Sequence, residues 1–289
     1  MKNNNVFVIT QKEAADHLHN TGFLVLLATY TAIIFASTYM YGSLVHQNNS
    51  VLLSSINVKM ISLFTPLVSI VLGFDAVVRE QKSGSLNVLL THPLFRDNVL
   101  AGKFLGSMLM VAAIIVFSVF VSVGTLLIFY GVEVGYIELI RIAAFTILTF
   151  FYAVTFLEIA VLISTMVKNA TDSLTYNIVI WIFICVLFGA ILKTVVAILT
   201  GQTATESVLI TQLLNISPLH HYGEAVIGRA DLSFMGVNVE STIGGIFDTE
   251  YTLTQCLVEF WMNIVVLIMT PIILFIIDFI IFLRKDITL

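Results

Sequence analysis

The chain has 289 residues, of which 58% are hydrophobic and only 11% are charged, and its formal net charge is −5. Its mean hydropathy of +1.02 excludes an ordinary water-soluble domain and indicates an integral membrane protein. Cys185 lies within an apolar run and Cys256 in a polar segment. We therefore expect the two cysteines at different membrane depths and not in a disulfide.

Residues 1–22 precede the first apolar run and are too polar to cross a bilayer. Phe7 and Leu18 stand at helix-compatible positions, and Lys12 and Glu13 stand on the other side of such a helix. The pattern predicts an amphipathic interface helix that lies along the inner membrane surface.

Six apolar runs follow, and each is long enough to cross a hydrocarbon core of about 30 Å. The sequence therefore predicts an all-α integral membrane fold, with six transmembrane helices in a single domain over residues 23–289. The predicted spans are residues 23–45, 56–78, 104–130, 142–167, 174–199 and 257–283.

An even number of spans puts both termini on one side of the membrane, and the distribution of lysine and arginine indicates which side. The segments that share a side with the termini carry Lys2, Lys12, Arg79, Lys82, Arg96, Lys103, Lys168, Arg284 and Lys285. The opposite segments carry Lys59, Arg141, Lys193 and Arg229. Both termini are therefore predicted to be cytoplasmic.

Residues 200–257 form the largest predicted piece outside the membrane, on the outer side. One helix is expected to stop at Pro218, and a second short helix is expected in the sequence HHYGEAVIG. Residues 235–255 are glycine-rich and polar without a clear period, so we expect a loop or short strands there.

Residues 79–103, between the second and third predicted spans, concentrate charge on the cytoplasmic side. The sequence SGS supplies a turn and capping hydroxyls, Leu86, Leu89 and Leu90 recur at i, i+3 and i+4, and Pro93 ends the run. This predicts a helix of about two turns, roughly 10 Å long. Such a helix suits insertion into the groove of a partner, and the alternative is that it lies on the inner leaflet.

The stretch REQKSGSLNVLLTHPLFRDNVLAGKFLG resembles the signature of permeases of ATP-binding-cassette (ABC) exporters of the second type. In that signature a glutamate, a Gly-Ser, a leucine-rich turn, a proline, an arginine and a Gly-Lys follow in this order. The resemblance implies a coupling helix that docks into an ATPase subunit, with the N-terminal helix around Lys12 and Glu13 packed beside it. The residues that it implies for coupling are Glu80, Gly84, Ser85, Leu86, Leu89, Leu90, Pro93, Arg96 and Lys103.

The resemblance implies a multi-pass transport subunit of the cell membrane that is not itself an enzyme. It also implies that the permease forms a homodimer with two cytoplasmic ABC ATPase subunits, which hold ATP and Mg. The sequence G-x-x-x-x-G-K-[ST], which forms a phosphate-binding loop, is absent from this chain. Energy for export is therefore expected to arrive through a protein contact. The sequence does not identify the transported substrate.

Two other functions stay open on the sequence. The resemblance extends to permeases that serve the maturation of secreted copper enzymes, and the acidic segment 200–257 is the candidate surface for an extracytoplasmic protein partner. The second is an intramembrane enzyme, although neither H-E-x-x-H nor G-x-S-x-G is present. We expect no metal site, because His220 and His221 are adjacent and lack further ligands, and no nucleic-acid partner.

Polar side chains within the predicted spans are candidates for a substrate path. Glu158 lies deep in the fourth predicted span, and Asn177 and Asn263 lie in the fifth and sixth. Each is expected either on such a path or in hydrogen bonds between helices. Asp278 stands near the end of the last span, so we expect its carboxylate to reach the inner interface.

Overall fold

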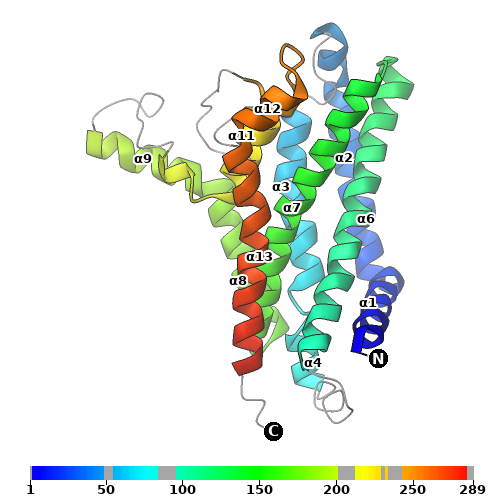
Figure 1. Ribbon diagram of the computed structural model, residues 1–289, viewed down its shortest axis with the longest axis vertical. Helices are drawn as coiled ribbons and strands as arrows, with labels where there is room; N and C mark the ends of the chain where they lie inside the picture. The colour runs from blue at the N-terminus through cyan, green and yellow to red at the C-terminus, as the bar shows by residue number, and fades with distance from the viewer. Residues whose placement is uncertain are drawn as a thin grey trace.

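The computed structural model describes residues 2–48, 55–83, 96–200, 212–228, 232–233 and 243–284. Every regular element in these ranges is helical, as the sequence predicted (Figure 1). In chain order the elements are α1 (Lys2–His19), α2 (Thr21–Asn48), α3 (Ser55–Gly73), α4 (Val78–Ser83), α6 (Arg96–Tyr130), α7 (Tyr136–Met166), α8 (Ala170–Ile182), the π-helix η1 (Phe183–Leu187), α9 (Phe188–Thr200), α11 (Pro218–Ile227), the 3-10 helix η2 (Gly245–Phe247), α12 (Leu253–Glu259) and α13 (Trp261–Arg284).

Five stretches within the described residues are long and apolar enough to cross a membrane, rather than the six that the sequence predicted. The difference lies in α3, because its apolar part, Asn57–Gly73, is shorter than the others. A turn over residues 74–77 then separates α3 from α4, so the helix does not continue to residue 78. The five stretches are Thr21–Met40, Asn98–Tyr130, Tyr136–Met166, Ala170–Leu199 and Trp261–Arg284.

α7 occupies the centre of the helix bundle and packs against α3, α6, α8 and α13 (Figure 1). Its apolar residues surround the whole helix, as is typical of a membrane span, and of the five stretches it has the largest buried share. Phe145, Tyr152 and Phe156 are fully buried. A Cβ added at Gly73 of α3 would lie only 2.9 Å from the Cβ of Ala160, so the glycine allows α3 to approach α7 closely.

Hydrogen bonds between neighbouring helices fix their register within the bundle. The hydroxyls of Tyr30 and Thr65 lie 2.9 Å apart between α2 and α3. The indole of Trp181 on α8 donates to the carbonyl of Leu63 on α3 at 3.0 Å. Water does not compete for these groups in lipid, so such bonds specify how apolar helices pair.

The predicted fifth span is bent rather than straight. The π-helix η1 separates α8 from α9, and Figure 1 shows α9 turning away from the bundle. A π-helical turn inserts an extra residue into the helix and is a known cause of bends. It places Cys185 in the core, where its Sγ lies 3.8 Å from the Tyr152 hydroxyl.

A small layer of short helices covers the end of the bundle opposite α1 (Figure 1), which we call the α11 end. α11 confirms the predicted second short helix, but it begins at Pro218, whose fixed φ suits a first helical position. It ends at Gly228 in a left-handed conformation with φ 61°. The Tyr222 ring stacks on Tyr152 with 4.6 Å between the ring centroids, and this contact seats α11 on α7.

The glycine-rich segment before the last span is partly helical in its described residues. η2 and α12 occupy positions for which loop or short strands were expected, and α12 begins with a capping box between Thr252 and Gln255. The last span therefore starts at Trp261, after α12 has ended, and not at residue 257.

The side chain of Arg141 fastens this layer to the first turns of α7. Its guanidinium is buried and donates hydrogen bonds to the carbonyls of Ile246, of Asp248 at 2.6 Å and of Tyr251 at 2.6 Å. One cation thus satisfies three backbone acceptors that would otherwise be desolvated at the edge of a membrane.

Candidate functional site

The candidate site lies at the opposite end of the bundle, which we call the α1 end, where α1 packs along the first turns of α6 (Figure 1). Two glycines on one face of α6 make this contact close. A Cβ added at Gly102 would lie 2.7 Å from the Cβ of Ile9, and one at Gly106 would lie 2.7 Å from the Cβ of Glu13. The glycines are four residues apart, and this G-x-x-x-G spacing allows two helices to approach at backbone distance.

An ion pair reinforces the glycine contact. Lys103 Nζ donates to both carboxylate oxygens of Glu13 at 3.1 Å, and the two side chains are only 8% and 15% exposed. The Thr10 hydroxyl lies 3.2 Å from the carbonyl of Gly102, beside the same contact. α6 has 35 residues and is about 50 Å long, so its first turns project beyond the hydrocarbon core and meet α1 there.

We expect Lys103→Met to weaken the docking of α1 on α6. The substitution leaves the Glu13 carboxylate largely buried without this cation, and a cost of about 2 kcal/mol lies between the values for surface and buried pairs. Double electron–electron resonance between spin labels at Val8 and Leu109, which are both exposed, measures the distance between the two helices.

Lys193→Met is the matched control, because Lys193 is exposed on α9 and distant from α1. The double variant Glu13→Lys/Lys103→Glu is expected to recover much of the docked population, because it restores an ion pair with reversed polarity. Equal label distances in Lys103→Met and the native protein would show that the pair does not hold α1.

A polar cavity of about 1010 Å³ lies beside this contact, between α1, the start of α2, the end of α3 and α4. Its lining includes Glu13, Asp16, His17, Asp75 and Arg79. Seven ionisable side chains line this cavity, which indicates that water reaches this end of the bundle, in contrast to the apolar surfaces of the spans.

His17 lies between this cavity and α6, with its Nε2 3.4 Å from the Ser107 hydroxyl. Burial lowers the pKa of the His17 imidazole from its ordinary value, although the nearby carboxylates of Glu13 and Asp75 act in the opposite direction. Docking of α1 therefore favours the neutral imidazole.

Acidification is expected to loosen α1. A histidine whose pKa is lowered in the docked state stabilises that state above its ordinary pKa, and the contribution is lost as the pH falls below about 6.5. The label distance between α1 and α6 should broaden on acidification between about pH 8 and pH 5. In His17→Gln, which cannot take up this proton, the same titration should leave the distance constant; an identical broadening would assign the effect to another group.

α4 lies next to this site and is bonded to the centre of the bundle. The Ser164 hydroxyl of α7 accepts hydrogen bonds from the backbone N–H groups of Val77 and Val78, each at 3.1 Å. This caps the start of α4 and fixes it to α7. Asp75 and Arg79 add an ion pair at 3.7 Å across one helical turn.

The residues predicted for coupling divide between described and undescribed parts of the chain. Glu80 belongs to α4 and Arg96 is the first residue of α6, while Lys103 pairs with Glu13 and Lys12 is exposed on α1. Gly84, Ser85, Leu86, Leu89, Leu90 and Pro93 lie outside the described residues.

Sequence reasoning missed two parts of this site. The G-x-x-x-G spacing of Gly102 and Gly106 is legible in GKFLG, but it was not weighed as a contact for α1. Ser164 carries no signal of its own, because serine is common within membrane helices and its partner is the backbone of a distant turn.

The structure does not gather the three predicted path residues in one place. Glu158 is fully buried on α7, and the fully buried Asn177 on α8 donates to the carbonyl of Ser173 at 2.9 Å. Asn263 lies at the start of α13, where its Oδ1 is 2.6 Å from His221 Nδ1. Asp278 is fully buried, so the expectation that its carboxylate reaches the interface is wrong.

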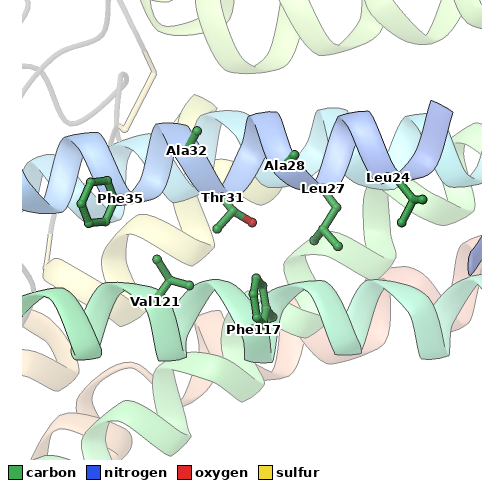
Figure 2. A pocket seen from close by; sticks show the side chains of 8 residues that line it. All are labelled: Leu24, Leu27, Ala28, Thr31, Ala32, Phe35, Phe117 and Val121. Carbon is green, nitrogen blue, oxygen red and sulfur yellow. The ribbon is translucent and has the colours of Figure 1, made fainter. Parts of the chain in front are cut away.

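An open groove of about 460 Å³ runs between α2 and α6 on the outside of the bundle. Figure 2 shows its walls, with Leu24, Ala28 and Phe35 among the side chains of α2, and Phe117 and Val121 facing them from α6. Hydrocarbon suits this lining, whereas a charged ligand would lose its hydration there without compensation. The groove is therefore a lipid-facing surface and not the path of a polar substrate.

The sequence profile of the family described as "ABC-2 family transporter protein" matches residues 7–287. The chain is 26% identical over 223 residues to the "probable ABC transporter permease protein NosY" of Stutzerimonas stutzeri, across 76% of this chain and 80% of the relative. A protein of the same name from Pseudomonas aeruginosa is 26% identical over 230 residues, across 75% of this chain and 79% of the relative. The chain therefore belongs to the ABC-2 family, as a membrane permease subunit of an ABC transporter.

Proposed function

We propose that this chain is the permease subunit of an ATP-driven exporter of the cell membrane. Two copies of the permease and two cytoplasmic ATPase subunits form the working assembly, and ATP with Mg²⁺ binds to the ATPase subunits. The chain itself receives motion through a protein contact and moves a substrate outward.

The observation that supports this proposal most directly is the anchoring of both flanks of residues 84–95. Before that segment, α4 is bonded to α7 through Ser164. After it, α6 is joined to α1 through Lys103 and Glu13. A force applied to residues 84–95 therefore reaches the central helix and the interface helix through direct contacts.

We place the α1 end in the cytoplasm and count α3 as a sixth, short span. Its apolar part, the 17 residues Asn57–Gly73, measures about 26 Å, which is close to the thickness of the hydrocarbon core. Six spans put the start of α1 and the end of α13 on one side, in keeping with their positions in Figure 1. That side also carries the excess of lysine and arginine.

Closure of the ATPase subunits moves the two coupling segments of the dimer toward each other. α4 and the first turns of α6 transmit this movement, and α1 travels with α6 because the glycine contact and the ion pair bind them. α7 passes the motion to α3 and α13, against which it packs. The whole is a rigid-body switch of packed helices between two arrangements.

Copurification tests this function. Leu89→Asp places a carboxylate on the apolar face of the predicted coupling helix, and we expect the ATPase subunit to be lost from the purified complex. Asn87→Asp adds the same charge outside the apolar stripe of Leu86, Leu89 and Leu90, and the complex is expected to survive. Retention of the ATPase in Leu89→Asp, or loss in both variants, would contradict the assigned contact.

A second candidate function is a permease that acts on an extracytoplasmic protein partner. The rigid layer at the α11 end, which Arg141 fastens to α7, supports it, because a docking surface needs a fixed shape. A photo-reactive residue at the exposed Ile216 should then form an adduct with one secreted protein in intact cells. A free exporter should give no such adduct.

A further inference from the structure

Two carboxyl groups lie in the interior of the bundle, in positions that the function proposed above does not use. Glu158 on α7 and Asp278 on α13 are both fully buried. Among the described residues, neither oxygen of the Glu158 side chain has a hydrogen-bond partner, and the donor beside the Asp278 carboxyl is the Thr165 hydroxyl. Ionised carboxylates in such surroundings lose their hydration without compensation.

The two carboxyl groups belong to one site. α7 and α13 pack against each other, and Glu158 interacts electrostatically with Asp278. Asp278 also neighbours Thr165, which follows Glu158 by two helical turns on the same face of α7. The Thr165 hydroxyl also lies 3.0 Å from the carbonyl of Val161, so its single proton serves both that carbonyl and the Asp278 carboxyl.

A third buried side chain near this level of the bundle also presents an unsatisfied acceptor. Asn177 is fully buried on α8, and its amide nitrogen donates to Ser173, but no donor among the described residues reaches its Oδ1. α8 follows α7 after a short turn and packs against it, and Asn177 and Glu158 lie seven to eight residues from that turn. The region therefore has an excess of acceptor oxygens, and a bound proton supplies the missing donor.

Other charged groups do not offset the two acids. The titratable groups on the helices that pack against α7 and α13 are paired, exposed, in the first turn of α6 or at the other end of the bundle. Lys103 on α6 is paired with Glu13, and Arg96 and Asp97 stand in the first turn of α6. Asp172 on α8, Glu259 on α12 and Arg284 on α13 are exposed. Toward the α11 end lie Lys59, Glu138, Arg141, His220, His221 and Glu224. In the described part of the chain, no group of three or more His, Cys, Asp or Glu side chains is arranged for a metal ion.

We propose that Glu158 and Asp278 form a proton-binding site between α7 and α13. Two carboxylates that interact in a desolvated site do not both ionise, and a proton on one converts it into a hydrogen-bond donor for its surroundings. The proton stays bound while the two helices are packed. Separation of α7 from α13 admits water, and the carboxyl group then releases its proton to that water.

The location links this site to the moving parts of the bundle. Thr165, which neighbours Asp278, directly follows Ser164, which holds the start of α4. Movement of α4 therefore acts on the segment of α7 that encloses the site. The proposal itself goes beyond the proposed function and does not depend on it, because burial and helix packing alone define the site.

Infrared spectroscopy of the full chain in lipid vesicles at neutral pH tests the proposal. The native protein should show the C=O stretching band of a protonated carboxyl group. Glu158→Gln and Asp278→Asn should each diminish the band, and the double variant should abolish it. Glu133→Gln, at an exposed carboxylate, is the matched control and should leave the band unchanged.

The thermal stability of the protein, measured as a function of pH, gives a second readout that is independent of the infrared band. The native protein should lose stability as the pH rises, because the unfolded chain releases the proton that the folded chain retains. The double variant Glu158→Gln/Asp278→Asn should lose much less thermal stability over the same pH range. Absence of the protonated-carboxyl band from the native protein would overturn the proposal, and so would removal of the band by added Na⁺, which would assign a cation site instead.

Discussion

Gly102→Leu is expected to detach α1 from α6 and to abolish coupled transport. Any side chain at this position meets Ile9 at 2.7 Å and the carbonyl of Val6 at 3.2 Å, and a backbone carbonyl of a neighbouring helix cannot turn aside. Overpacking of this kind costs about 1–3 kcal/mol, which shifts the population of docked α1 by roughly 5- to 150-fold. The distance between spin labels at Val8 and Leu109 should lengthen and broaden.

Gly124→Leu provides the matched control on the same helix. Apart from its chain neighbours and the backbone of its own helix, no atom of the described chain lies within 4 Å of a Cβ added at Gly124, so the larger side chain enters open space. This variant should keep the native label distance and the native transport rate. If Gly102→Leu also kept α1 docked, the close helix contact would not be what holds α1 in place.

Arg141→Met is expected to release the segment that contains η2 and α12 from α7. Three carbonyl groups lose their charged donor together, and hydrogen bonds to charged groups contribute about 1.5–3 kcal/mol each. These contributions are not additive, so a total of about 3 kcal/mol is a conservative expectation. Amide hydrogen exchange over residues 243–252 should therefore accelerate by roughly 100-fold.

The effect of Arg141→Met should remain local to the α11 end. Arg284→Met, which removes an exposed arginine at the α1 end, should leave exchange over residues 243–252 at its native rate. Unchanged exchange in Arg141→Met would mean that the covering layer is held by its apolar contacts, such as Tyr222 on Tyr152, and not by the guanidinium.

The long apolar runs predicted the all-α class and the positions of most helices, because burial in lipid leaves few alternatives to a helix. The bends and ends of the helices depend on tertiary contacts, which the apolar runs do not reveal. The sequence FICVL contains neither proline nor glycine, yet η1 bends the fifth run and places Cys185 in the core. Gly73 looks like a packing residue within a span, but it is also where α3 ends.

Single residues of the candidate site could be predicted from the sequence, but the contacts between them could not. Glu13 and Lys103 each stand out as charges next to apolar runs, but a separation of 90 residues hides their contact. Asp278 was misplaced because distance from the chain end was taken as depth, whereas helix packing encloses its carboxylate. The position of a residue along a helix can be predicted from the sequence, whereas the neighbouring helix toward which its side chain points cannot.

A photo-reactive residue at position 89 of the full-length chain tests the proposed coupling contact most directly. Illumination of intact cells should yield one adduct, between this residue and a cytoplasmic nucleotide-hydrolysing subunit, whereas the same probe at the lipid-facing Leu109 should yield none. An adduct with an extracytoplasmic protein, or no adduct at position 89 in an active complex, would contradict the account.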